Sequence, residues 1–261
     1  MRRDGRSPAD LRPVQIEAEW KKQGDGSVLY RAGGTVVLCV ASVDDGVRDF
    51  LRGRGQGWVT AEYVMHPRAG AKRQARDGFN GRTLSGRSHE IARLVGRALR
   101  AAVDPTALGE RTITVDCDVL EADGGTRTAS VTGGMVALAL ALDALRKRVT
   151  LPGRPLVALV AAVSAGIVGG DALLDLCYEE DRDAEMDLNV VAVAGGEGTA
   201  MVELQATAER APVPRARVDG LVDLALGGIG ALGAVQRAAL AAAGVDLGAL
   251  TAKLPGAAAG F

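Results

Sequence analysis

Two short glycine-arginine motifs carry the residue types that bind phosphate. The first, Asp123-Gly124-Gly125-Thr126-Arg127-Thr128, lies where a predicted strand turns into a predicted helix. Its glycines let main-chain N–H groups approach an anion, the helix start adds a positive dipole, and Thr126 and Arg127 add further donors. The second motif, Gly86-Arg87-Ser88, opens the preceding predicted helix. Together they predict one phosphate held between two arginines, although either motif alone is more often an ordinary turn.

An acidic run from Tyr178 to Asn189 is the second candidate site, because its carboxylates are denser than a surface loop requires. Asp187 begins a predicted strand, and Asp181 lies on the connection that leads into it. Two carboxylates that converge there would hold one Mg²⁺ that keeps several waters, the usual way in which hard cations meet phosphate substrates. A solvated acidic turn is the alternative interpretation of the same residues.

The charge distribution supports a polyanionic partner although the net charge is only −1. Residues 48–100 contain 12 Arg and Lys against four acidic residues, whereas residues 171–187 contain eight acidic residues against Arg182 alone. A basic segment beside a separate carboxylate site is typical of a protein that binds a polyanion. Two unremarkable solvated faces would give the same charge pattern.

The elements that must position these motifs form two similar halves. Runs rich in β-branched residues predict a meander of strands at 13–20, 27–31 and 35–43, and further strands at 58–65 and 111–120. Helices are expected from Ser88, taken as the N-cap, to Asp104-Pro105, and from the glycines at 124 and 125 to about Arg148. The second half predicts strands within 156–206 and a helix over 218–243. Strands followed by helices, twice, indicate an α+β fold with pseudo-repeated halves.

The motifs together, in their order, resemble the ribonuclease PH family over roughly residues 3 to 240. The resemblance rests on Gly86-Arg87-Ser88-His89-Glu90, on the run from Asp116 to Ser130, on the acidic run, and on three further segments. These segments are Arg3-Asp4-Gly5-Arg6, Gly55 to Tyr63, and Pro67-Arg68 with Arg73 and Arg76. The resemblance implies the ribonuclease PH-type fold, which is similar to domain 2 of ribosomal protein S5.

The resemblance also implies a function. Members of this family are phosphate-dependent 3′-to-5′ exoribonucleases that trim tRNA precursors, release nucleoside diphosphates, and assemble as homohexamers, each a trimer of dimers. The resemblance implies that inorganic phosphate binds to Arg87, Gly125, Thr126 and Arg127. It implies that catalysis and Mg²⁺ binding fall to Asp181 and Asp187, and that RNA is contacted by Arg68, Arg73 and Arg76. The long polar stretch 67–86 that carries the last three residues is itself typical of a functional loop.

The sequence departs from the family pattern at a few positions, and two other functions remain as alternatives. His66, Met135 and Ala206 stand where the family usually has other residues, and they bear on packing, subunit contacts and substrate choice. One rival is a non-catalytic ring subunit, which is disfavoured because both candidate sites are present. Another is a nucleoside phosphorylase, which would not need the arginines of the polar stretch.

The remaining features predict the cellular location and the domain organisation of the protein. Single cysteines at positions 39, 117 and 177, and a charged beginning without an apolar segment, predict a cytoplasmic protein that does not span a membrane. Residues 1–243 are expected to form one catalytic unit, and 244–261 a C-terminal tail. The helix that begins after the glycines at 124 and 125 is apolar nearly all round, which predicts a buried helix. A protein this poor in aromatic residues, with an apolar helix around 135–145, is also expected to hide part of its surface between subunits.

Overall fold

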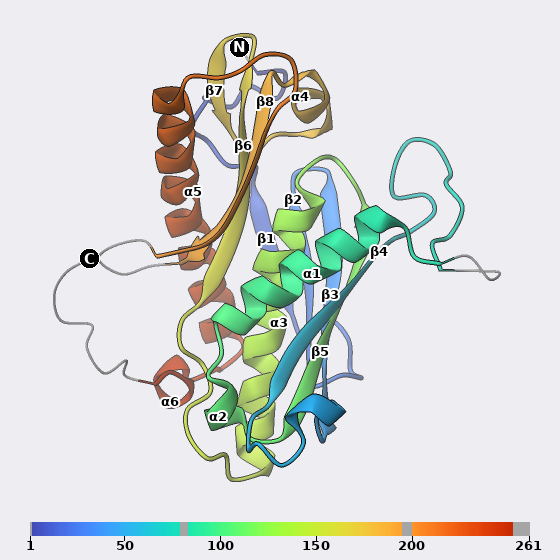
Figure 1. Cartoon of the computed structure of the whole chain (residues 1–261), viewed down its shortest axis with the longest axis vertical. Helices are drawn as coiled ribbons and strands as arrows, with labels where there is room; N and C mark the ends of the chain where they lie inside the picture. The colour runs from blue at the N-terminus through green and yellow to red at the C-terminus, as the bar shows by residue number, and fades with distance from the viewer. Residues whose placement is uncertain (1, 79–82, 195–199, 253–261) are drawn as a thin grey trace, which may run out of the picture.

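Two β-sheets, with helices packed on their faces, form the molecule in the computed structural model, which describes residues 2–78, 83–194 and 200–252 (Figure 1). The first half of the chain supplies the five-stranded sheet, and the second half supplies the four-stranded sheet. The predicted α+β class with two halves of strands followed by helices is confirmed.

The five-stranded sheet has the strand order β1-β2-β3-β5-β4. Its first three strands form the predicted antiparallel meander, and β4 runs parallel to β5. In β5, Ile113, Val115 and Cys117 are buried while the residues between them are only half-buried, which confirms the predicted alternation. The strands are β1 (Val14–Ala18), β2 (Gly26–Ala32), β3 (Thr35–Asp45), β4 (Trp58–Met65) and β5 (Arg111–Glu121).

Helix α3 (Thr126–Arg148) is the centre of the core, because it packs against β2 and β3 of the first sheet and against β6 of the second. Its side chains Met135, Leu138 and Leu142 are 0% exposed. Burial of each stabilises the fold by roughly 2 kcal/mol. The helix is therefore covered by the sheets of its own chain, which confirms the predicted buried helix but not a helix covered between subunits.

Helix α1 (Gly86–Ala101) packs on β4 and α3, and α2 (Pro105–Leu108) follows it. The N-cap of α1 is Ser85, whose hydroxyl accepts a hydrogen bond of 3.2 Å from the backbone N–H of Ser88. The predicted N-cap, Ser88, instead lies in the first helical turn. The difference arises because two serines three residues apart can both cap a helix, and the preceding backbone decides between them.

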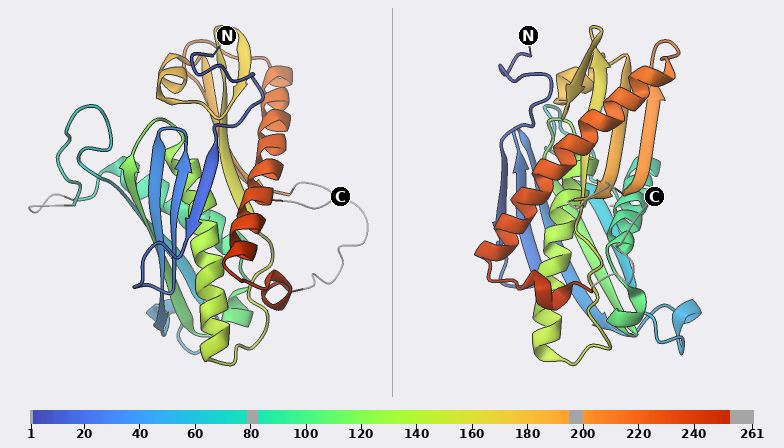
Figure 2. Two further views of the ribbon diagram at one scale, coloured as in Figure 1. Left: turned by 180° about the vertical axis from the view of Figure 1, so that it is seen from behind. Right: turned by 90° about the vertical axis from the view of Figure 1, so that its left-hand side faces the viewer.

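The second half forms a sheet of order β7-β6-β8-β9 with α5 (Arg215–Ala242) along one face (Figure 2). Its strands are β6 (Val160–Val168), β7 (Asp171–Leu174), β8 (Met186–Val193) and β9 (Met201–Ala208). Asp181 lies on the connection that leads into β8, as predicted, and this connection contains a short helix, α4 (Tyr178–Asp183).

In the part of the chain that the structure describes, two helices have the length and apolar composition that a membrane span needs, α3 and α5. The apolar window of α3 is 94% buried inside the protein, which identifies α3 as a core helix, and that of α5, which packs against β6, is 33% buried.

In the predicted tail, α6 (Leu247–Leu250) docks through the buried Leu250, whose carbonyl accepts a hydrogen bond from Leu156 N–H. Residues 253–261 of that tail lie outside the described residues.

Candidate active site

The phosphate motif forms a tight turn between β5 and α3. Gly124 and Gly125 have φ values of +76° and +64°, in the left-handed region that favours glycine. A Cβ atom on Gly124 would lie 2.6 Å from the carbonyl oxygen of Leu176, just before α4. The glycine therefore lets the turn approach the segment that leads to Asp181. The two candidate sites, 50 or more residues apart in sequence, are in backbone contact here.

Thr126 and Arg127 occupy the first turn of α3, where backbone N–H groups have no helical partners. The hydroxyls of Thr126 and Tyr63 lie 2.8 Å apart. If Tyr63 donates this bond, the hydroxyl hydrogen of Thr126 is free to reach an anion. Arg127 is half-buried, and its guanidinium donates to the side-chain oxygen of Gln205 at 2.8 Å. It also lies 3.7 Å from the carboxylate of Glu90 on α1.

Arg87 is exposed in the first turn of α1. The start of this helix is held by Asp77, whose carboxylate accepts from the hydroxyl of Ser88 at 2.6 Å and from the hydroxyl of Ser85 at 2.9 Å. The Ser88 hydrogen bond lowers the pKa of Asp77 below its ordinary value. The polar stretch is thus tied to the helix that carries Arg87.

The two candidate catalytic carboxylates have raised pKa values. For Asp181 the cause is desolvation, which the charges of Arg127 and Arg87 partly oppose. For Asp187 the cause is again desolvation, with further contributions from the charges of Asp181 and Glu209. Among the described residues neither carboxylate lies within 4.0 Å of a basic side chain, whereas Asp183 pairs with Arg182 at 2.8 Å. A cation bound between Asp181 and Asp187 would favour their ionised forms and would lower both pKa values.

One cleft of about 1700 Å³ brings the predicted phosphate and carboxylate residues together. Residues of both halves of the chain line this cleft. The predicted residues that line the cleft are Arg87, Gly125, Thr126, Arg127, Asp181 and Asp187.

Arg68, Arg73 and Arg76 are exposed on the stretch between β4 and α1, which projects from the body of the molecule (Figure 1). They do not line the cleft. Their neighbour Lys72 does, and so does Arg210. Basic side chains therefore contribute to the cleft, and the three predicted arginines lie outside its lining.

Sequence reasoning missed Gln205 as a member of the site. Its signal is the strand register: Asp187 and Asn189 alternate with buried residues along β8, and Asn189 lies opposite Gln205 on β9. Both polar positions therefore lie on the cleft side of the sheet. Tyr178, at 57% exposure, and Glu209 also line the cleft and were not selected from the sequence.

The family departures have separate locations. Met135 is fully buried in the core, so its effect is on packing. His66 and Ala206 line the cleft, and the Nδ1 atom of His66 accepts from the backbone N–H of Arg68 at 3.2 Å. Departures at these two positions can affect substrate contacts.

Models of the two domains of the 3′ exoribonuclease family match the chain, domain 1 over residues 10–142 and domain 2 over residues 158–228. The chain belongs to this family. It is also 51% identical over 237 residues to ribonuclease PH of Solibacter usitatus (strain Ellin6076), an alignment that covers 91% of this chain and 98% of the relative. The predicted family, and with it a phosphate-dependent 3′-to-5′ exoribonuclease of the nucleotidyltransferase class, is confirmed.

Two solved structures share the fold of this family member. Rrp46 of rice (Oryza sativa) superposes with a TM-score of 0.70 at 16% identity, covering 92% of this chain and all of the other. An Archaeoglobus fulgidus exosome with RNA bound to the active site gives a TM-score of 0.67 at 23% identity, covering 87% of this chain and 89% of the other. At these identities the likeness concerns the fold, and it confirms the predicted ribonuclease PH type.

Proposed function

We propose that the chain shortens the 3′ ends of tRNA precursors, transferring each terminal nucleotide to inorganic phosphate and releasing a nucleoside diphosphate. The observation that carries this proposal is the shared cleft, which is lined by the anion-binding groups of two helix starts and by a pair of carboxylates. An acceptor phosphate and a phosphodiester must meet there in line. Such a site needs charge compensation and alignment rather than a nucleophilic side chain.

The side chains divide this work. We assign Arg87, Gly125, Thr126 and Arg127 to the inorganic phosphate, because backbone donors at the start of α3 and two guanidinium groups suit its oxygens. Asp181 and Asp187 are the catalytic pair, and one of them passes a proton to the departing 3′ oxygen. Their raised pKa values support such a transfer.

Asp181 and Asp187 also suit one Mg²⁺. The described residues contain no group of three or more His, Cys, Asp and Glu side chains that would form a cage. Two carboxylates without a basic partner are the donor set of a Mg²⁺ that keeps several waters. When bound, the cation would neutralise charge that builds up between the two phosphate groups.

The substrate and the assembly follow from the same residues. Arg68, Arg73 and Arg76 lie beyond the cleft, where they would contact the body of a tRNA precursor rather than its 3′ end. We place the catalytic unit in residues 1–243, working in the cytoplasm as a homohexamer built as a trimer of dimers. Residues 244–261 remain assigned to a C-terminal tail.

The two rivals make different demands on the chain. A non-catalytic ring subunit would not need both the anion-binding groups and the carboxylates in one cleft. A nucleoside phosphorylase would not need a basic stretch outside the cleft. The combination supports a phosphorolytic exoribonuclease acting on a long polyanion.

The deciding experiment incubates a 3′-extended tRNA with the full chain and Mg²⁺, with and without inorganic phosphate. We expect shortening only with phosphate, release of nucleoside diphosphates, and addition of nucleotides when diphosphates are supplied in excess. Release of monophosphates in phosphate-free buffer would contradict the proposal.

A further inference from the structure

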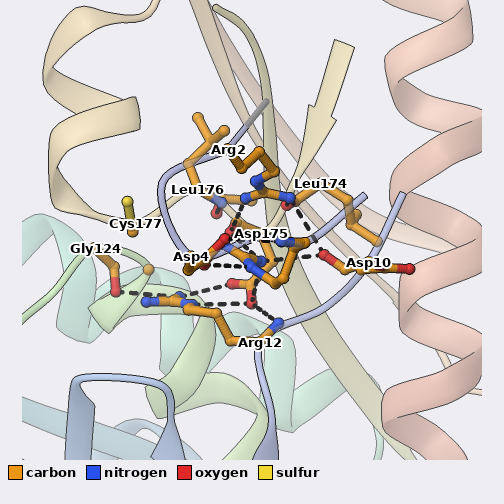
Figure 3. A network of polar contacts seen from close by, with 12 residues as sticks. Arg2, Asp4, Asp10, Arg12, Gly124, Leu174, Asp175, Leu176 and Cys177 are labelled. Atoms are coloured by element: carbon orange, nitrogen blue, oxygen red, sulfur yellow. Dashed lines mark hydrogen bonds and ion pairs between the residues drawn. The ribbon is translucent and has the colours of Figure 1, made fainter. Parts of the chain in front are cut away.

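The N-terminal arm (residues 2–12) lies across both halves of the site, although it belongs to neither sheet. It passes over the phosphate turn at Asp123–Gly125 and over the segment 174–180 that leads into α4 (Figure 3). The first segment leads into Thr126 and Arg127, and the second leads into Asp181. The arm is thus in contact with the supports of both reacting groups.

Arg12 makes the central connection. Its side chain is 4% exposed, and its guanidinium holds both carboxylate oxygens of Asp175, at 2.6 Å and 3.0 Å. The same guanidinium donates to the backbone carbonyl of Asp123 at 2.5 Å and approaches that of Gly124 at 3.5 Å. One planar group therefore fixes the distance between the phosphate turn and residue 175.

The backbone of Asp175, the partner of Arg12, is also fixed in one conformation. Asp175 is 5% exposed, and it adopts a φ of +52°, which is uncommon for a residue other than glycine. Its N–H donates to the carbonyl of Ser164 at 2.7 Å, and the hydroxyl of Ser164 accepts from the N–H of Leu176. The strained backbone thus turns directly into the segment that contacts Gly124 and begins α4.

A second contact fixes α4 itself. Arg2, with a side chain 3% exposed, donates two hydrogen bonds to Glu180, at 2.7 and 2.8 Å, and one to the backbone carbonyl of Asp175 at 3.0 Å. Glu180 in turn accepts from the N–H of Cys177 and so caps α4. Asp181 is the next residue along this helix.

The energetics favour a role beyond stability. Transfer of a guanidinium and a carboxylate from water into the interior costs several kcal/mol per ion, so a buried pair adds little net stability compared with apolar residues of similar size. The pair does impose one geometry, because the hydrogen-bonding groups of both partners are directed. The geometry that it imposes here is the spacing of the two halves of the site.

We infer that Arg12 and Asp175 are positioning residues that set the separation between the inorganic-phosphate site and Asp181. The inference rests on the proposed phosphorolytic function and deepens it. In-line transfer depends steeply on alignment, and a misplacement of about 1 Å costs on the order of 100-fold in rate. Weakening the contact between Arg12 and Asp175 should therefore raise the KM for phosphate and lower turnover. It should leave the affinity for RNA unchanged.

The test uses Arg12→Lys, which keeps the charge but cannot reach Asp175 and Asp123 together, and Asp175→Asn, which keeps the shape. We expect each to lower kcat by about tenfold or more and to raise the KM for inorganic phosphate by about tenfold, with the KM for tRNA unchanged. The control is Asp143→Asn. Asp143 is equally buried, at 4%, and pairs with Arg146 and Lys147 away from the cleft.

The control should lower the thermal midpoint without changing the KM for phosphate. If Arg12→Lys and Asp175→Asn behave like the control, the positioning role is wrong. If the variants do not fold, the inference is tested on the unmodified protein by amide hydrogen exchange with and without phosphate. Phosphate should slow exchange at residues 175–178 as well as at 124–127, and protection confined to 124–127 would overturn the inference.

Failure of the proposed function would look different. It would show as an unmodified protein that does not require phosphate. Failure of the positioning role would leave that requirement intact.

Discussion

The side-chain oxygen of Gln205 accepts a 2.8 Å hydrogen bond from the guanidinium of Arg127. The amide nitrogen of Gln205 faces the carboxylates of Glu90 and Glu203, at 3.1 and 3.2 Å. Carboxylates can only accept, so they fix the orientation of the amide and leave its oxygen directed at Arg127. Gln205 therefore fixes the guanidinium of Arg127 in one orientation at the start of α3.

Gln205→Ala should weaken phosphate binding, because Arg127 would then turn toward Glu90, already 3.7 Å away. We expect the KM for inorganic phosphate to rise about tenfold, which corresponds to ~1.4 kcal/mol, with kcat changed little. Initial rates over a phosphate titration measure it. Gln15→Ala, an exposed glutamine on β1, is the matched control and should have no effect. An unchanged KM in Gln205→Ala would exclude the orienting role.

Asp187→Asn should cut turnover by about 100-fold or more, a loss of roughly 3 kcal/mol in the transition state, while tRNA affinity stays normal. Asp181→Asn should do similar damage. Asp183→Asn, on the same acidic run but paired with Arg182 at the surface, should be nearly silent. Steady-state kinetics and tRNA binding of the three variants check this. Equal small effects at all three positions would favour a solvated acidic turn.

Burial raises the pKa of Asp187, and this has a consequence for stability in a chelating buffer. A carboxyl group with a raised pKa in the folded state ionises more readily after unfolding. Its stabilising contribution is therefore present below the unfolded pKa and is lost as the pH rises through the folded value. Asp187→Asn should raise the thermal midpoint at pH 7 without metal and should have no such effect at low pH. Thermal unfolding across pH measures the difference.

Gly124→Ala should damage both stability and activity. The left-handed φ of +76° costs about 1–2 kcal/mol in alanine, and the contact with the carbonyl of Leu176 adds about 1–3 kcal/mol. Gly170→Ala is the control, since Gly170 has a φ of +85° but nothing within 4 Å of an added Cβ. Chemical denaturation and kcat are the measurements. We expect the control to lose stability alone, and a similar kcat in both variants would argue against the close approach.

Replacement of the arginines beyond the cleft should weaken tRNA binding and reduce its salt dependence, because fewer counterions are released. The slope of log affinity against log salt should fall by roughly 2 to 3 for three lost contacts, and a short oligonucleotide should be affected less. The variant is Arg68→Ala with Arg73→Ala and Arg76→Ala. A charge-matched control changes Arg31, Arg148 and Arg215, which pair with carboxylates on other surfaces. Equal slopes for the two triple variants would remove the RNA role.

The sequence predicted the parts of this molecule that depend on local pattern. The alternation of Ile113, Val115 and Cys117 predicted a half-buried strand, and the glycines at 124 and 125 predicted a turn before a helix. The motifs around Arg87, Arg127 and Asp187 predicted a site, and the structure brings them into one cleft. Each of these signals lies within about ten consecutive residues.

What escaped prediction depends on contacts between distant segments. Gln205 acquires its role only when β9 pairs with β8 and faces α1. Arg12 acquires its role only when the arm meets Asp175, and no local pattern marks either residue. The apolar composition of helix α3 predicted that it is buried, but composition cannot distinguish cover by a partner chain from cover by a second sheet of the same chain.

Arg12 and Asp175 are 163 residues apart in sequence. The contact between them therefore determines how late in protein synthesis the site can be completed. Residues 2–12 leave the ribosome long before their partners around Asp175 and Glu180, which emerge only after the whole first sheet has been made. Closure of such a long span is an unfavourable and late step in folding. A nascent chain that holds the phosphate turn alone would therefore be unable to attack the RNA around it, and competence would arise only when the second half has folded.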